Sequence, residues 1–99
     1  MAREIHHLSA RVVATAKKVG RHPDGGGLYL SISKNGGRRW VFLYQKDGKT
    51  TEMGLGSAVA GAVTLAQARD AAGLHRAQLA AGLDPLSERR AKARRLYAG

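Results

Sequence analysis

The sequence predicts an α+β fold: a three-stranded antiparallel sheet packed against one main α-helix, with a short N-terminal helix and a basic C-terminal linker helix. Two strong hairpin signals predict the sheet, because Asn35-Gly36 and Asp47-Gly48 separate three stretches in which apolar and polar residues alternate. A further signal predicts the main helix, since Thr64 and Gln67 match a capping box ahead of an alanine-rich segment.

The composition indicates one small domain with a polyanionic partner. The chain has 99 residues, of which 43% are hydrophobic, enough for a thin core. It has no cysteine, which excludes disulfides and thiolate metal sites, and we expect neither a membrane span nor a signal peptide. The formal net charge of +10 favours nucleic acid as the partner over an acidic protein, a membrane surface or a merely solubilising charge.

The N-terminal third is predicted to contain one helix and the first strand. Leu8 to Lys18 has the pattern of a short helix that Ser9 caps and Gly20 ends. Asp24 to Gly27 is rich in glycine but lacks the Lys-Ser/Thr of a phosphate-binding loop, so we interpret it as the entrance to a strand. Leu28 to Ser33 alternates between apolar and polar residues and is that strand.

Arg38 to Tyr44 is predicted to be the central strand. Trp40, Phe42 and Tyr44 lie two residues apart, so all three point to one face of the sheet. Each aromatic ring buries about 150–250 Å², and this face is therefore predicted to form the core against the main helix. The opposite face stays free, or the N-terminal helix covers it in an alternative arrangement with three layers.

The C-terminal half is predicted to contain the third strand and two helices. Thr50 to Leu55 alternates and forms the strand, and the main helix runs from its Thr64 cap to about Ala81. Its alanines allow a close approach to the sheet and leave room for the aromatic rings. Asp84-Pro85 starts a last helix that is too polar to pack well alone. The cations of this last helix are Arg89, Arg90, Lys92, Arg94 and Arg95.

No catalytic set can be read from the sequence. The acidic residues are scattered, and neither Ser nor Tyr occurs in a nucleophile motif. The histidines lack metal-ligand spacing and are expected to be isolated surface residues. They are His6, His7, His22 and His75. We therefore expect no enzyme activity, no cofactor and no small-molecule substrate.

The candidate site is the sheet face opposite the aromatic residues, together with the hairpin tips. A β-ribbon fits the DNA major groove, where Arg39 can read guanine, Glu52 can accept from cytosine and hairpin lysines can bind phosphates. The predicted DNA-binding residues are Tyr29, Ser31, Ser33, Lys34, Arg38, Arg39, Val41, Leu43, Lys46, Lys49, Thr50 and Glu52. The alternative is an exposed sheet face without a binding role.

Several segments, in this order, resemble one protein family. They are Asp24 to Leu30, Arg39 to Tyr44, Met53 to Gly56, Thr64 to Arg69 and Ala81 to Pro85. Together they are similar to the N-terminal arm-type DNA-binding domain of prophage and genomic-island tyrosine recombinases (integrases). The resemblance implies a three-stranded sheet that enters the major groove at arm sites flanking the recombination core.

The resemblance also implies a domain organisation and a setting. Residues 1–85 are expected to form the arm-type domain and residues 86–99 a basic linker helix toward core-binding and catalytic domains of a parent recombinase. The expected partners are double-stranded DNA and other integrase protomers, in the bacterial cytoplasm at the nucleoid. Two alternatives stay open: a basic module for protein interaction or multimerisation, and an RNA-binding module. Many family members have Arg where this chain has Val41 or Leu43, which places more of the base contact on Arg39.

Overall fold

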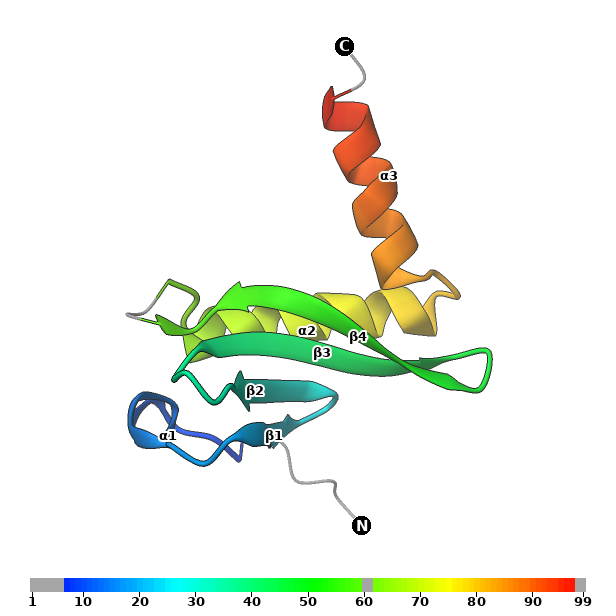
Figure 1. Ribbon diagram of the computed structural model, residues 1–99. Helices are drawn as coiled ribbons and strands as arrows, with labels where there is room; N and C mark the ends of the chain where they lie inside the picture. Colours follow the sequence, from blue (N-terminus) through cyan, green and yellow to red (C-terminus); the bar gives the residue numbers. More distant parts are fainter. Residues whose placement is uncertain (1–6, 60–61, 98–99) are drawn as a thin grey trace.

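A four-stranded antiparallel sheet and three helices make up the described part of the chain (Figure 1). The structure is a computed structural model that describes residues 7–59 and 62–97, with side chains as far as residue 94. The expectations for His6, for the N-terminal segment before it and for the side chain of Arg95 lie outside these residues. The elements are α1 (Ala10–Thr15), β1 (Gly20–Gly25), β2 (Leu28–Ile32), β3 (Arg38–Lys46), β4 (Lys49–Ser57), α2 (Leu65–Ala80) and α3 (Pro85–Tyr97).

The sheet has four strands and not three, because Gly20–Gly25 forms the edge strand β1. It pairs antiparallel with β2, with Arg21 opposite Ser31. Pro23 lies inside β1, and an edge strand tolerates proline because one side of its backbone needs no ladder hydrogen bonds. The glycines before β2 therefore form a hairpin turn rather than a simple strand entrance.

Helix α1 is shorter than the sequence predicted. Ser9 caps it as expected, since its side chain accepts a hydrogen bond from the Val12 N–H, but the helix ends at Thr15. Gly20 begins β1 instead of ending the helix. With six residues, α1 is too short to be stable by itself, so packing against the rest of the domain must hold it.

The predicted hairpins β2–β3 and β3–β4 are confirmed. At the β3–β4 turn, Asp47 and Gly48 have φ angles of 51° and 77°, and positive angles at both central residues are what a type I′ turn requires. Strand β4 is longer than expected and contains a bulge, because Trp40 pairs with Gly56 while Val41 pairs with Gly54.

The core lies between the sheet and α2, as the aromatic pattern predicted. Trp40 and Phe42 are 0% and 1% exposed, and they share one hydrophobic cluster with Ala68 and Ala72 of α2. The capping box of α2 is present, with Thr64 as the cap. The indole N–H of Trp40 donates to the Val63 carbonyl at 2.8 Å, which joins β3 to the residues just before α2.

The fold has two layers, and the three-layer alternative is wrong. Leu8 belongs to the same buried cluster as Trp40, and Val13 of α1 packs against that cluster. Helices α1 and α2 therefore lie on one side of the sheet. We call the opposite side of the sheet the outer face.

A buried ion pair fixes β1 against α2. Asp24, at 1% exposure, accepts from Arg69 Nε at 2.9 Å and from Arg69 Nη2 at 3.0 Å. The backbone N–H of Leu8 donates to the same carboxylate at 2.8 Å. The hydrogen bonds that Arg69 donates to Asp24 raise the pKa of the Arg69 guanidinium, so this side chain stays charged. One acidic residue thus connects the N-terminal segment, the edge strand and the main helix.

A second carboxylate, that of Asp84, connects the C-terminal end of β3 to the start of α3. Helix α3 projects away from the rest of the domain (Figure 1). Asp84 accepts from the Tyr44 hydroxyl at 2.6 Å, from Lys46 Nζ at 2.7 Å and from the Ser87 hydroxyl at 2.8 Å. These hydrogen bonds, first of all the one from Lys46, hold the pKa of Asp84 well below its usual range. Burial and the bond to Asp84 raise the pKa of Tyr44.

Candidate nucleic-acid interface

The outer face holds the predicted residues that come from strand interiors. Cross-strand pairing places Ser31 beside Arg39 and Tyr29 beside Val41, and it places Leu43 beside Glu52. Paired residues point to the same side of a sheet, and these alternate with the aromatic core residues along β3. The predicted residues on this face are Tyr29, Ser31, Arg39, Val41, Leu43, Thr50 and Glu52.

Glu52 joins two arginines across the outer face. Its Oε1 accepts from Arg39 Nη2 at 3.0 Å, and its Oε2 accepts from Arg21 Nη2 at 2.5 Å. Arg21 and Glu52 lie on β1 and β4, the two edge strands, which three strand spacings of about 4.8 Å would separate by about 14 Å on a flat sheet. The side chains of Arg21 and Glu52 therefore extend toward each other across the outer face. Arg39, the residue expected to read guanine, already has a partner in this structure.

Val41 is fully buried although it points to the outer face. It is 0% exposed and does not belong to the core cluster on the helix side. Arg39 and Glu52 lie on either side of the row that Val41 forms with Gly54, so their side chains must cross that row to meet. Direct contact between DNA and Val41, one of the predicted DNA-binding residues, requires this ion pair to move.

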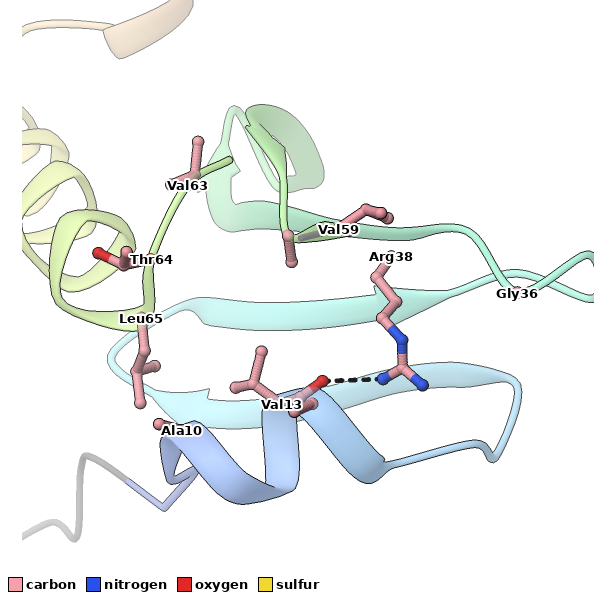
Figure 2. A pocket seen from close by; sticks show the side chains of 10 residues that line it. Ala10, Val13, Gly36, Arg38, Val59, Val63, Thr64 and Leu65 are labelled. Atoms are coloured by element: carbon pink, nitrogen blue, oxygen red, sulfur yellow. Dashed lines mark hydrogen bonds between the residues drawn. The ribbon is translucent and has the colours of Figure 1, made fainter. Parts of the chain in front are cut away.

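Two residues predicted to bind DNA from the ends of the central strand point to the helix side of the sheet. Arg38 lies two residues before Trp40, so both side chains point to the same face of the sheet. Its Nη1 donates to the Val13 carbonyl at 2.8 Å (Figure 2). It lines a mostly aliphatic groove of about 400 Å³ between α1, the start of β3 and the start of α2. Lys46 lies two residues after Tyr44, so it also points to the helix side, where it is bound to Asp84. Both side chains are thus bound on the helix side of the sheet.

The hairpin tips carry the remaining predicted residues. Ser33 and Lys34 are exposed in the turn between β2 and β3, where the Ser33 hydroxyl donates to Asn35 Oδ1 at 2.5 Å. Lys49 is exposed beside the β3–β4 turn, where it pairs across the hairpin with Lys46. Both turns lie at the ends of β3, so their lysines flank the outer face rather than occupy it.

A hollow adjoins Arg39 at the end of the outer face nearest the β2–β3 turn. Its volume is about 430 Å³, and serine hydroxyls from Ser31, Ser33 and Ser57 line it together with arginine side chains. Hydroxyl and guanidinium groups both donate hydrogen bonds to phosphate oxygens and base acceptors. The hollow thus places such donors beside Arg39, together with the apolar Val59.

Sequence reasoning missed Arg21, because it missed the whole of β1. The side chain of Arg21 is 51% exposed and reaches Glu52 from the opposite edge of the sheet. Gly26-Gly27 carried a usable signal, since a Gly-Gly pair between two extended segments is typical of a tight hairpin. Read that way, the pair would have placed Arg21 opposite Ser31, on the same face as Arg39.

The expectation of isolated surface histidines is wrong for His75. This residue is half-buried on α2, its ring centroid lies 5.8 Å from that of Phe42, and its Nδ1 lies 2.9 Å from Gln78 Oε1. Over the described ranges, no group of three His, Cys, Asp or Glu side chains is placed to hold a metal ion. Within the same part of the chain, no helix has both the length and the apolar character to cross a membrane.

Within the described residues, the outer face carries arginines and serines with lysines at its turns, a composition typical of nucleic-acid-binding domains. Comparison with known families gives a specific match, in which the Arm DNA-binding domain family aligns with residues 8–92. The chain belongs to this family.

Known proteins similar to the chain are integrases. The integrase of Enterobacteria phage P4 is 41% identical over 81 residues, which cover 79% of this chain and 18% of that protein. The integrase of Shigella phage Sf6 and the prophage integrase IntS of Escherichia coli K12 are each 33% identical over 87 residues, covering 85% of this chain and 22% of the relative. The chain thus spans about a fifth of the length of the curated relatives it matches.

Proposed function

We propose that this chain binds arm-type sites on double-stranded DNA by inserting the outer face of its sheet into the major groove. The observation that carries the proposal is the division of the sheet into two unequal faces. The aromatic residues, α1 and α2 occupy one face. The other face carries Arg21, Arg39 and Glu52, and no helix of the described residues covers it. Family membership supplies DNA as the partner, and the width of the major groove admits a β-ribbon.

The proposed contacts divide between base edges and phosphates. In this proposal Arg39 and Glu52 meet base edges, and Ser31 lies beside Arg39. Lys34 and Lys49 flank the face at its two turns, a position suited to phosphates on either side of the groove. Arg38 and Lys46 are bound within the domain on the helix side, so we assign them no base contact.

We further propose that the chain serves site-specific recombination as the arm-binding part of a tyrosine recombinase. The support is its likeness to about a fifth of the length of each of three integrases. In this proposal residues 1–85 are the DNA-binding unit, residues 86–99 lead toward core-binding and catalytic domains, and the protein works at the bacterial nucleoid. The domain is non-catalytic by itself.

The salt dependence of DNA binding tests the electrostatic part of this proposal. If the chain neutralises about six phosphates, the logarithm of its affinity should fall with the logarithm of salt concentration at a slope of about −5. Fluorescence anisotropy with a duplex selected from a random library by the chain itself measures this slope. Affinity that does not change with salt contradicts the proposal.

Arg39→Ala tests whether the outer face reads sequence. A good bidentate contact to guanine contributes about 1–3 kcal/mol of discrimination, so the variant should lose about tenfold to a hundredfold affinity for the selected duplex. Its loss for a scrambled duplex should be smaller. Equal losses for both duplexes would make Arg39 a phosphate contact.

A second candidate function is protein interaction through α3, with another protomer as the partner. Figure 1 shows α3 standing away from the sheet, and its exposed cations include Arg89, Arg90 and Arg94. Leu74 and Leu83 near its base are 59% and 44% exposed. Chemical-shift mapping separates the two functions, because shifts on the outer face with DNA favour the first, and concentration-dependent shifts on α3 without DNA favour the second. Competition by structured RNA against the duplex tests the RNA-binding alternative.

A further inference from the structure

One carboxylate holds both arginines that the structure describes on the outer face. Glu52 of β4 binds Arg21 of β1 and Arg39 of β3 at the same time, one arginine on each oxygen. These three residues come from three different strands, so the network forms only when the whole sheet is assembled. Its position coincides with the surface that we assign to DNA.

The network is exposed enough for DNA to open it. The side chains of Arg21, Arg39 and Glu52 are 51%, 62% and 32% exposed. Ion pairs at this exposure stabilise a fold only slightly, because water screens them and long side chains lose freedom when they are held. A competing anion or base edge can therefore take the arginines without disrupting the core.

Resting on the DNA-binding role proposed above, we propose that Glu52 is the specificity-determining residue of the outer face. Its carboxylate holds Arg21 and Arg39 away from unrelated DNA and releases them at a matching sequence. Unrelated DNA offers phosphates, which compete with Glu52 for the arginines and are themselves repelled by the carboxylate. Glu52 thereby weakens binding that depends on charge alone.

A matching sequence can satisfy all the groups that leave the network. In the major groove a G·C pair presents the guanine acceptors O6 and N7 beside the cytosine N4 donor. Arg39 and Glu52, whose Nη2 and Oε1 atoms lie 3.0 Å apart, present a donor beside an acceptor. This pattern is complementary to one G·C pair. When the contact between Arg39 and Glu52 opens, the base edges give both side chains new hydrogen-bond partners, whereas phosphates give partners only to the arginines.

The test compares Glu52→Gln with Asp70→Asn on two duplexes. Both variants lose one negative charge, but Asp70 is exposed on α2, on the other side of the sheet from the outer face. One duplex is selected from a random library by the wild-type chain, and the other is a scrambled duplex of the same base composition. Anisotropy titrations over a series of salt concentrations give affinity and salt slope, and circular dichroism checks folding.

Glu52→Gln is expected to bind the scrambled duplex on the order of tenfold more tightly, with a salt slope steeper by about 0.9–1.8, as one or two new phosphate contacts predict. The ratio of affinities for the two duplexes should fall accordingly. Asp70→Asn should change neither the ratio nor the slope by as much. Equal effects of the two variants would reduce the role of Glu52 to net charge and overturn the proposal.

A double-mutant cycle tests whether Glu52 restrains Arg21, that is, whether it holds Arg21 away from unrelated DNA. Arg21→Gln should change binding to the scrambled duplex little in the wild-type background, where Glu52 holds Arg21, and should weaken it several-fold in the Glu52→Gln background. The same loss in both backgrounds refutes the restraint. If the wild-type chain binds neither duplex at low salt, the DNA-binding function is refuted. If the wild type binds but Glu52→Gln has the same ratio of affinities for the two duplexes as the wild type, only the role of Glu52 is refuted.

Discussion

Removing the buried carboxylate of Asp24 should destabilise the domain more than any surface change on the sheet. Asp24→Ala deletes both hydrogen bonds that Arg69 donates to it and the one from the Leu8 N–H. Asp24 lies within β1, so the change also removes the connection between that strand and α2. The guanidinium of Arg69 then remains beside the core without its counter-charge.

The expected loss of stability follows from the burial of the two partners. Breaking a buried ion pair by removing one side costs about 3–5 kcal/mol, because the other charge is left uncompensated. The Arg69 side chain keeps 26% exposure, so water compensates part of its charge. We therefore expect a loss near the lower end, about 3 kcal/mol, which is a large share of the roughly 5–15 kcal/mol that stabilises a typical domain.

Urea unfolding of Asp24→Ala, Arg69→Met and the double variant measures this effect. The double variant should be less destabilised than the sum of the single variants, because it removes the charge that Asp24→Ala leaves behind. Hydrogen exchange should show that the amides of β1 lose protection before those of β3. A loss below about 1 kcal/mol for Asp24→Ala, or additive losses in the cycle, would contradict the importance of this contact.

Two further changes probe the Asp84 junction and the β1–β2 turn. Because the folded pKa of Asp84 lies below its ordinary value of 3.8, its stabilising effect is present above that pH and is lost as the pH falls toward the lower value. Thermal melts of Asp84→Asn and the wild type should therefore differ at neutral pH and converge in strong acid, and a constant difference would argue against the low pKa. Gly27→Ala should cost at least about 1 kcal/mol more than Gly48→Ala, since both glycines have positive φ but only at Gly27 would the new Cβ meet Leu43 O and Phe42 at 2.8 Å. Equal unfolding free energies for the two alanine variants would contradict this close approach.

The parts of the fold that the sequence predicted depend on local signals. Trp40 and Phe42 have strict two-residue spacing, Asp47-Gly48 has strong turn chemistry, and Thr64 begins a capping box. Each signal lies within a few residues, so its structural consequence does not require knowledge of distant contacts. The structure confirms all of them.

The parts that were missed depend on contacts between distant segments. Strand β1 has little strand propensity, and Asp24, held by Arg69 from α2, helps to fix it in place. Arg38 and Lys46 were predicted to bind DNA from the ends of β3, but they are bound on the helix side to the Val13 carbonyl and to Asp84, which lie far away in the sequence. The pairing of Glu52 with Arg21 could not be inferred while β1 was unknown. Composition indicated the kind of site, and only the assembled sheet shows which charges face each other.

The Asp84 junction has a mechanical consequence for α3. The helix has 13 residues and is therefore about 20 Å long. A tilt of about 10° at its base moves its far end by about 3 Å, given that length. Tyr44 and Lys46 hold that base from the end of β3 nearest the Lys49 turn. The base of α3 is thus attached to β3, the strand that carries Arg39. A small rotation of the β3–β4 hairpin that tilts this base therefore shifts the far end of α3 by several ångströms.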